Sequence, residues 1–113
     1  MRGKIYFENK CIGYVEMESS EMFRVEGKIL LNEEGEKLTF FFNFIIDDDF
    51  KRGIKKPDFD IETYLDDSKW HIIKEDGTRH DIWSPVVYPD GKIYWKWKSE
   101  IKDKGKSKKK KLF

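Results

Sequence analysis

The sequence Leu-Thr-Phe-Phe-Phe-Asn-Phe-Ile-Ile at residues 38–46 is the most apolar run of the chain, and the predicted fold is built around it. Every second residue of the run is large and apolar, and the positions between them alternate between polar and apolar side chains. Side chains of a strand point alternately to the two faces of a sheet, so this pattern predicts a strand with one wholly hydrophobic face. The run is too short to span a membrane, and three consecutive Phe disfavour a helix.

Alternating side chains also predict strands before this run. A turn led by Asn predicts a hairpin of residues 3–8 and 11–18. Residues 22–31 show the clearest alternation, with one apolar and one charged face. A polar turn at residues 32–35 follows, and we therefore expect residues 22–31 to pair antiparallel with 38–46.

A second hairpin is predicted in the C-terminal half of the chain, where residues 69–74 and 78–83 flank the sequence Glu-Asp-Gly. A three-residue loop with Gly77 in the left-handed conformation sets His71 opposite Asp81. A two-residue loop would instead oppose two basic residues, which is unfavourable. The sequence therefore predicts the first register.

Three further segments complete the predicted fold. Residues 47–58 show no period and form a long loop. Residues 59–65 fit either a strand or a short helix capped by Asp58 or Asp60, and we predict a strand. A Pro-Asp-Gly turn then leads into the last strand, residues 92–98.

The predicted fold is all-β: a small antiparallel β-sandwich or β-barrel of about eight short strands joined mainly by hairpins. The 113 residues suffice for one hydrophobic core. We therefore expect a single domain over residues 1–100, followed by a disordered Lys-rich tail at residues 101–113.

The formal net charge of +1 hides an asymmetry along the chain. Seven of the 23 basic residues and one of the 22 acidic residues lie in residues 101–113, which gives this segment a net charge of +6 and leaves residues 1–100 with −5. An acidic body thus carries a basic tail.

The sequence predicts a cytoplasmic, non-enzymatic protein without a cofactor. A single Cys11 excludes an internal disulfide framework, and no signal-peptide or transmembrane pattern is visible. Cys11 with His71 or His80 has the residue types of a nucleophile and its base, but no Gly-rich elbow surrounds the thiol, so a small buried thiol is favoured. His71 and Asp81 are best explained as a cross-strand polar pair.

No metal site is predicted. One Cys and two His exclude a structural zinc site. The Asp residues at 47–49, together with Asp58 and Asp60, have carboxylates suited to Ca²⁺ or Mg²⁺, but their spacing does not match a calcium-binding loop. A solvated acidic run that protects the preceding apolar segment from aggregation is the preferred interpretation.

The last strand interleaves aromatic and basic residues, as single-stranded nucleic-acid platforms do. At a period of two, Trp95 and Trp97 face the core, while Tyr94 shares the other face with Lys residues. A nucleic-acid-binding module of oligonucleotide-fold type is therefore one hypothesis. Its candidate contacts lie on the last strand and in the tail: Tyr94, Lys96, Lys98, Lys104, Lys106, Lys108, Lys109, Lys110 and Lys111.

The hypothesis preferred from sequence is a small protein that binds another protein, as an accessory factor or inhibitor, including phage-encoded or immunity types. Its partner would contact the acidic face or the long loop, through Asp47, Asp48, Asp49, Lys51, Arg52, Lys55 and Lys56. A barrel that holds a small apolar ligand is a third hypothesis. The sequence leaves a homodimer open.

Overall fold

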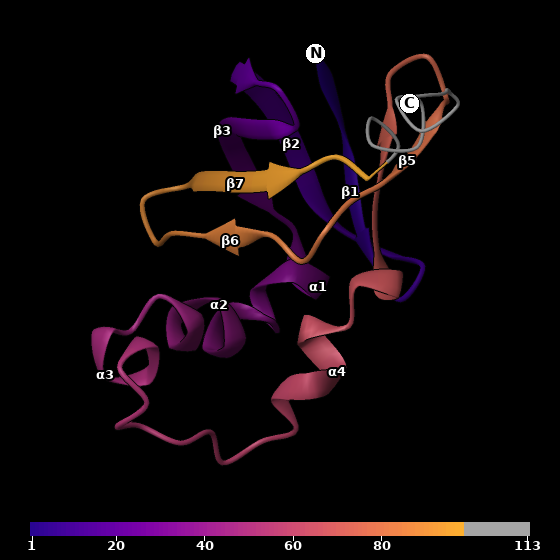
Figure 1. Ribbon diagram of the computed structural model, residues 1–113. Helices are drawn as coiled ribbons and strands as arrows, with labels where there is room; N and C mark the ends of the chain where they lie inside the picture. The colour runs from indigo at the N-terminus through magenta and orange to yellow at the C-terminus, as the bar shows by residue number, and fades with distance from the viewer. Residues whose placement is uncertain (99–113) are drawn as a thin grey trace, which may run out of the picture.

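The computed structural model describes residues 1–98 and shows a mostly β protein with one curled antiparallel sheet (Figure 1). In spatial order its seven strands are β5 (Arg79–Asp81), β4 (Trp70–Lys74), β1 (Arg2–Phe7), β2 (Lys10–Glu21), β3 (Arg24–Leu31), β7 (Lys92–Lys96) and β6 (Val86–Val87). The sheet forms a half-barrel. Within residues 1–98 there is neither an eighth strand nor a second sheet to make a sandwich.

The half-barrel is closed at one end, where the chain directly after β5 meets the chain directly after β7. Ile82 and Trp97 form an isolated antiparallel bridge. The Trp83 N–H donates to the Lys96 carbonyl oxygen (3.1 Å), and the Lys98 N–H donates to the Asp81 carbonyl oxygen (3.0 Å). These hydrogen bonds curl the sheet so that one of its faces is enclosed.

The enclosed face carries the core. Ile5 of β1 and Ile72 of β4 are register partners, and both are fully buried. On the same face but in different strands, Val25 of β3 opposes Trp95 of β7, and these residues are 2 % and 3 % exposed. The predicted apolar face of residues 22–31 and the predicted inward position of Trp95 are thus confirmed, because alternation in these two strands separates a buried from a wet face.

A helical segment between β3 and β4 covers the end of the sheet where the β1–β2 turn lies, away from the β2–β3 and β4–β5 turns (Figure 1). Its elements are α1 (Glu33–Glu36), α2 (Thr39–Ile45), α3 (Asp48–Lys51), α4 (Ile61–Leu65) and a 3₁₀ turn (Asp67–Lys69). None of the helices among the described residues has the length and hydropathy of a membrane span.

The predicted strand at residues 38–46 is wrong, because this run forms α2, and its predicted pairing with residues 22–31 is therefore absent. In a helix, Leu38, Phe41 and Phe42 lie on one face, and all three are buried in the core. Phe40 is 45 % exposed. A run in which nearly every position is apolar satisfies both the helical period of 3.6 residues and the strand period of two, so periodicity alone does not distinguish a helix from a strand here.

The residues before α2 also form a helix instead of the predicted hairpin turn. The Asn32 side-chain oxygen accepts from the Gly35 N–H (2.9 Å) and caps α1. Gly35 is packed so closely against β2 that a Cβ atom there would overlap the Ile12 carbonyl oxygen. This cap and this close contact turn the chain from β3 into α2.

Residues 61–65 form α4, so the strand predicted at 59–65 is wrong and the alternative, a short helix capped by Asp58 or Asp60, is correct. Asp60 is at the N-cap position, but its side chain forms no capping hydrogen bond. The two predicted hairpins are confirmed. In the second, Gly77 adopts a positive φ of 89° and His71 pairs with Asp81, as the three-residue loop requires. The predicted tail, residues 101–113, lies outside the described residues.

Replacing Phe41 by Ala should lower the free energy of unfolding by about 3–5 kcal/mol, because a fully buried ring leaves a cavity. Phe40→Ala is the matched control in the same helix. It should lower the free energy of unfolding clearly less, since Phe40 is half-exposed. Urea denaturation followed by circular dichroism measures both losses. A greater loss for Phe40→Ala than for Phe41→Ala would contradict the helical packing of this run.

Candidate binding groove

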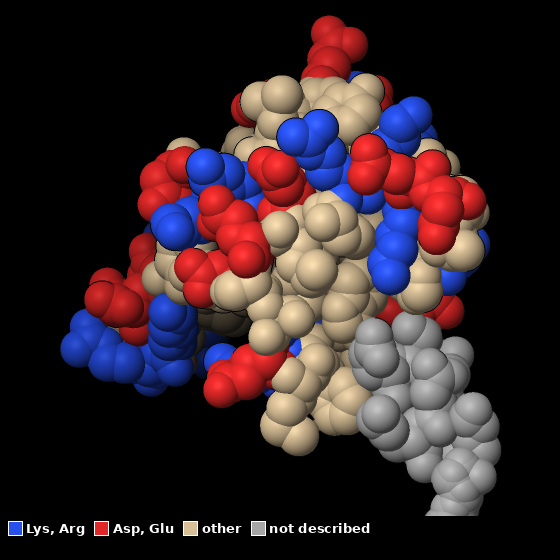
Figure 2. Space-filling view, turned by 90° about the horizontal axis from the view of Figure 1, so that it is seen from above, with Lys and Arg blue, Asp and Glu red and all other residues tan. Residues whose placement is uncertain are grey.

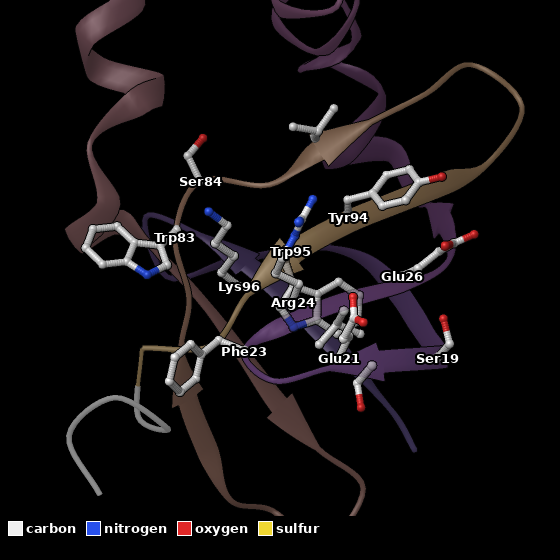
Figure 3. A pocket seen from close by; sticks show the side chains of 13 residues that line it. Ser19, Glu21, Phe23, Arg24, Glu26, Trp83, Ser84, Tyr94, Trp95 and Lys96 are labelled. Carbon is white, nitrogen blue, oxygen red and sulfur yellow. The ribbon is translucent and has the colours of Figure 1, made fainter. Parts of the chain in front are cut away.

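An open groove of about 1120 Å³ lies over β3 and β7 (Figure 3). The end of the β2–β3 hairpin borders it on one side, and residues 83–86 border it on the other. The side chains that matter for its chemistry are Glu21, Phe23, Arg24, Glu26, Trp83, Tyr94 and Lys96. These residues come from three separate parts of the chain, which the curled sheet brings together.

Two cations lie side by side in the groove. Arg24 of β3 and Lys96 of β7 are directly opposed in the antiparallel register. Neither side chain forms an ion pair with a carboxylate among residues 1–98. Like charges directly opposed in a sheet are destabilising. An anion bound between them would relieve this repulsion.

Two aromatic rings lie on opposite sides of the cations (Figure 3). Tyr94 precedes Lys96 by two residues on the same face of β7, and its ring meets Tyr88 edge-on at 5.6 Å between centroids. Trp83 lies beside Lys96 through the backbone hydrogen bond described above. Tyr94 and Trp83 are each 38 % exposed, so both rings offer area to a ligand.

Acidic side chains also border the groove. Glu26 pairs with Lys92 (3.5 Å), which partly neutralises it, whereas Glu21 lies opposite Arg24 in the β2–β3 register. On the face shown in Figure 2, basic and acidic side chains are interspersed, without a broad patch of one sign. The groove therefore has a local pair of cations with two acidic side chains beside it.

The last-strand residues proposed from sequence as nucleic-acid contacts are brought together here. Tyr94 and Lys96 line the groove. Lys98 lies at its border, where its ammonium group is 4.7 Å from the Trp83 ring centroid and donates to the Asp67 carbonyl oxygen (2.9 Å). The tail residues of the same hypothesis lie outside the described residues: Lys104, Lys106, Lys108, Lys109, Lys110 and Lys111.

The loop proposed as a protein-binding segment is ordered by its own charges. The Asp47 carboxylate caps α3 by accepting from the N–H groups of Asp49 (2.8 Å) and Phe50 (3.3 Å), and these bonds, with Lys55, lower the pKa of Asp47. Lys55 pairs with Asp47 at 3.3 Å, and Arg52 pairs with Asp49 at 2.7 Å. The other candidates, Asp48, Lys51 and Lys56, are exposed.

The structure separates the residues considered for catalysis. Tyr6 of β1 is the register partner of both Cys11 and His71, so a whole strand lies between the thiol and the imidazole. Cys11 is half-buried, with its Sγ 3.6 Å from the Gly13 carbonyl oxygen. Among residues 1–98, no group of three or more His, Cys, Asp or Glu side chains is arranged to hold a metal ion.

His71 is the one buried charged or polar side chain among residues 1–98, and it lies on the face of β4 opposite the core residues Trp70 and Ile72. Its ring stacks on Tyr6, with 4.7 Å between centroids and an interplanar angle of 5°. Burial lowers the pKa of His71, and the positive charge of Arg79 lowers it further, whereas Asp81 acts in the opposite direction. The folded protein therefore favours the neutral imidazole.

Sequence reasoning missed Arg24 and Trp83. Arg24 joins the site only because β3 pairs with β7, which lies more than sixty residues away in the chain. Trp83 reaches it through the closure of the half-barrel. Strand partners of this kind leave no local pattern, since each strand shows only its own alternation.

Comparisons with known proteins add no functional information about this arrangement: no family model matches the chain, and neither a curated protein nor a solved structure matches it.

The free energy of unfolding should fall as the pH is lowered from about 7 to about 5. The unfolded chain takes up a proton on His71 near the ordinary pKa of 6.5, whereas the folded protein resists it, so this stabilisation is present above pH 6.5 and is lost below it. Asp47, Asp66 and Asp76 have pKa values lowered from 3.8 and change charge only at lower pH.

Urea denaturation at several pH values in this window measures the effect. The His71→Gln variant should show a shallower decline than the parent protein, because it lacks the titrating group. Parallel stability curves for the two proteins would show that His71 is not responsible.

Proposed function

We propose that the protein binds single-stranded nucleic acid in the groove over β3 and β7. The observation that carries the proposal is the opposed, unpaired Arg24–Lys96 pair between two half-exposed aromatic rings. Proteins that bind single strands combine cations that contact phosphates with rings that stack on bases. The groove has both elements within one surface.

The charge of the protein sets the expected strength of this binding. Residues 1–100 carry a net charge of −5, which repels a polyanion at long range. The groove itself offers two cations to phosphate, so the body contributes a small salt dependence. The +6 charge of residues 101–113 adds sequence-independent affinity, because the last groove cation, Lys96, is close to this segment in the chain.

The two other hypotheses have less support. Several charges of the 47–58 loop are engaged in capping and ion pairs within the loop, so binding a protein there would compete with those contacts. The concave face of the sheet is filled by side chains such as Trp70, Phe41 and Ile72, each at most 1 % exposed. Both ideas remain predictions from sequence, as does a relation to the oligonucleotide fold.

The charge-reversal variant Arg24→Glu/Lys96→Glu should bind a fluorescein-labelled deoxythymidine oligomer of about 12 nucleotides at least about tenfold more weakly at low salt. The physical reason is the loss of two charge-assisted contacts to phosphate. Fluorescence anisotropy with the full chain measures the affinity.

The matched control is Lys10→Glu/Lys51→Glu, which changes the net charge by the same amount at exposed positions outside the groove. This control should lose clearly less affinity than the groove variant. Equal losses in the two double variants would mean that only net charge matters, and the groove would not be the binding site.

A further inference from the structure

The order of side chains along the groove indicates which part of a nucleic acid it takes, an inference that rests on the proposed function. Tyr94, Lys96 and Trp83 follow one another across the groove, with Arg24 beside Lys96 (Figure 3). Tyr94 and Lys96 are two residues apart on one strand, so their backbones are about 6.6 Å apart. The groove thus presents a ring, then a pair of cations, then a second ring. An extended single strand presents a base, then a phosphate, then a second base, so the two orders match.

Both rings are held in place before any ligand arrives. Tyr94 packs edge-on against Tyr88, and Trp83 is held under the ammonium group of Lys98, which is itself fixed by the Asp67 carbonyl oxygen. The backbone of Trp83 is fixed by its hydrogen bond to Lys96. A preformed platform loses little conformational entropy on binding.

We infer that the groove binds one phosphodiester step of a single strand, with the phosphate between Arg24 and Lys96 and the two flanking bases on Tyr94 and Trp83. Both bases must be unstacked from a partner strand to reach these rings. In a duplex the base faces are hidden, and the second strand would bring phosphates toward Glu21 and Glu26. The site therefore selects single strands, with little preference among bases.

The test compares three ligands of equal length with the full chain: a deoxythymidine oligomer, an abasic oligomer with the same phosphodiester backbone, and a duplex. The deoxythymidine oligomer should bind at least about tenfold more tightly than the abasic oligomer, because stacking adds to the phosphate contacts. The duplex should bind no better than the abasic oligomer. Fluorescence anisotropy at several salt concentrations measures all three.

Ring variants locate the stacking. Trp83→Leu and Tyr94→Leu should each reduce the advantage of the deoxythymidine oligomer over the abasic oligomer, and should leave binding of the abasic oligomer nearly unchanged. The matched control is Tyr14→Leu, which removes an exposed tyrosine that lies outside the groove. Circular dichroism checks that each variant is folded, and Trp83→Phe, which keeps a ring, should retain most of the advantage.

The outcomes separate this inference from the proposed function. If no oligonucleotide binds the full chain at low salt, the proposed function is wrong. If the deoxythymidine and abasic oligomers bind equally, the protein contacts only phosphates, and the stacking inference falls while the proposed function stands. Polyglutamate that binds as tightly as the deoxythymidine oligomer would overturn the inference in favour of an acidic protein segment.

Discussion

The backbone hydrogen bonds between residues 81–83 and 96–98 are the constraint on which both the core and the groove depend. They join the chain after β5, one edge of the sheet, to the end of β7, so that one face becomes concave and encloses apolar side chains. The same contact places Trp83 beside Lys96 on the outside. A single set of main-chain contacts therefore closes the hydrophobic core and completes the proposed binding surface.

The features that could be predicted from sequence are those set by neighbouring residues. Both hairpins, the loop with Gly77 and the inward direction of Trp95 depend on turn chemistry and on a period of two, which a local reading detects. The strand predicted at residues 38–46 is wrong because the apolar residues of this run satisfy the helical period and the strand period at once. In the folded protein this run follows α1, whose Gly35 packs against Ile12 of β2, a contact that the local sequence does not reveal.

The same distinction applies to the candidate site. Tyr94 and Lys96 were found because they alternate with buried tryptophans on one strand. Arg24 and Trp83 were missed because their places follow from which strands become neighbours, and the sequence of one chain does not reveal strand order. Candidate functional residues on the exposed face of a strand can be recognised from its sequence. Which of these residues form one site depends on the order of the strands in the folded sheet.

The position of the helical segment has a consequence for how the chain folds. Residues 33–69 separate β3 from β4, yet β4 must pair with β1 and β7 with β3. Pairings so distant in the chain form slowly, whereas hairpins form early. During synthesis, residues 38–46 leave the ribosome after β1–β3 but before β4 and β7, which complete their core. Until β4 and β7 have been synthesised, the nascent chain thus lacks part of the surface that buries its most apolar run.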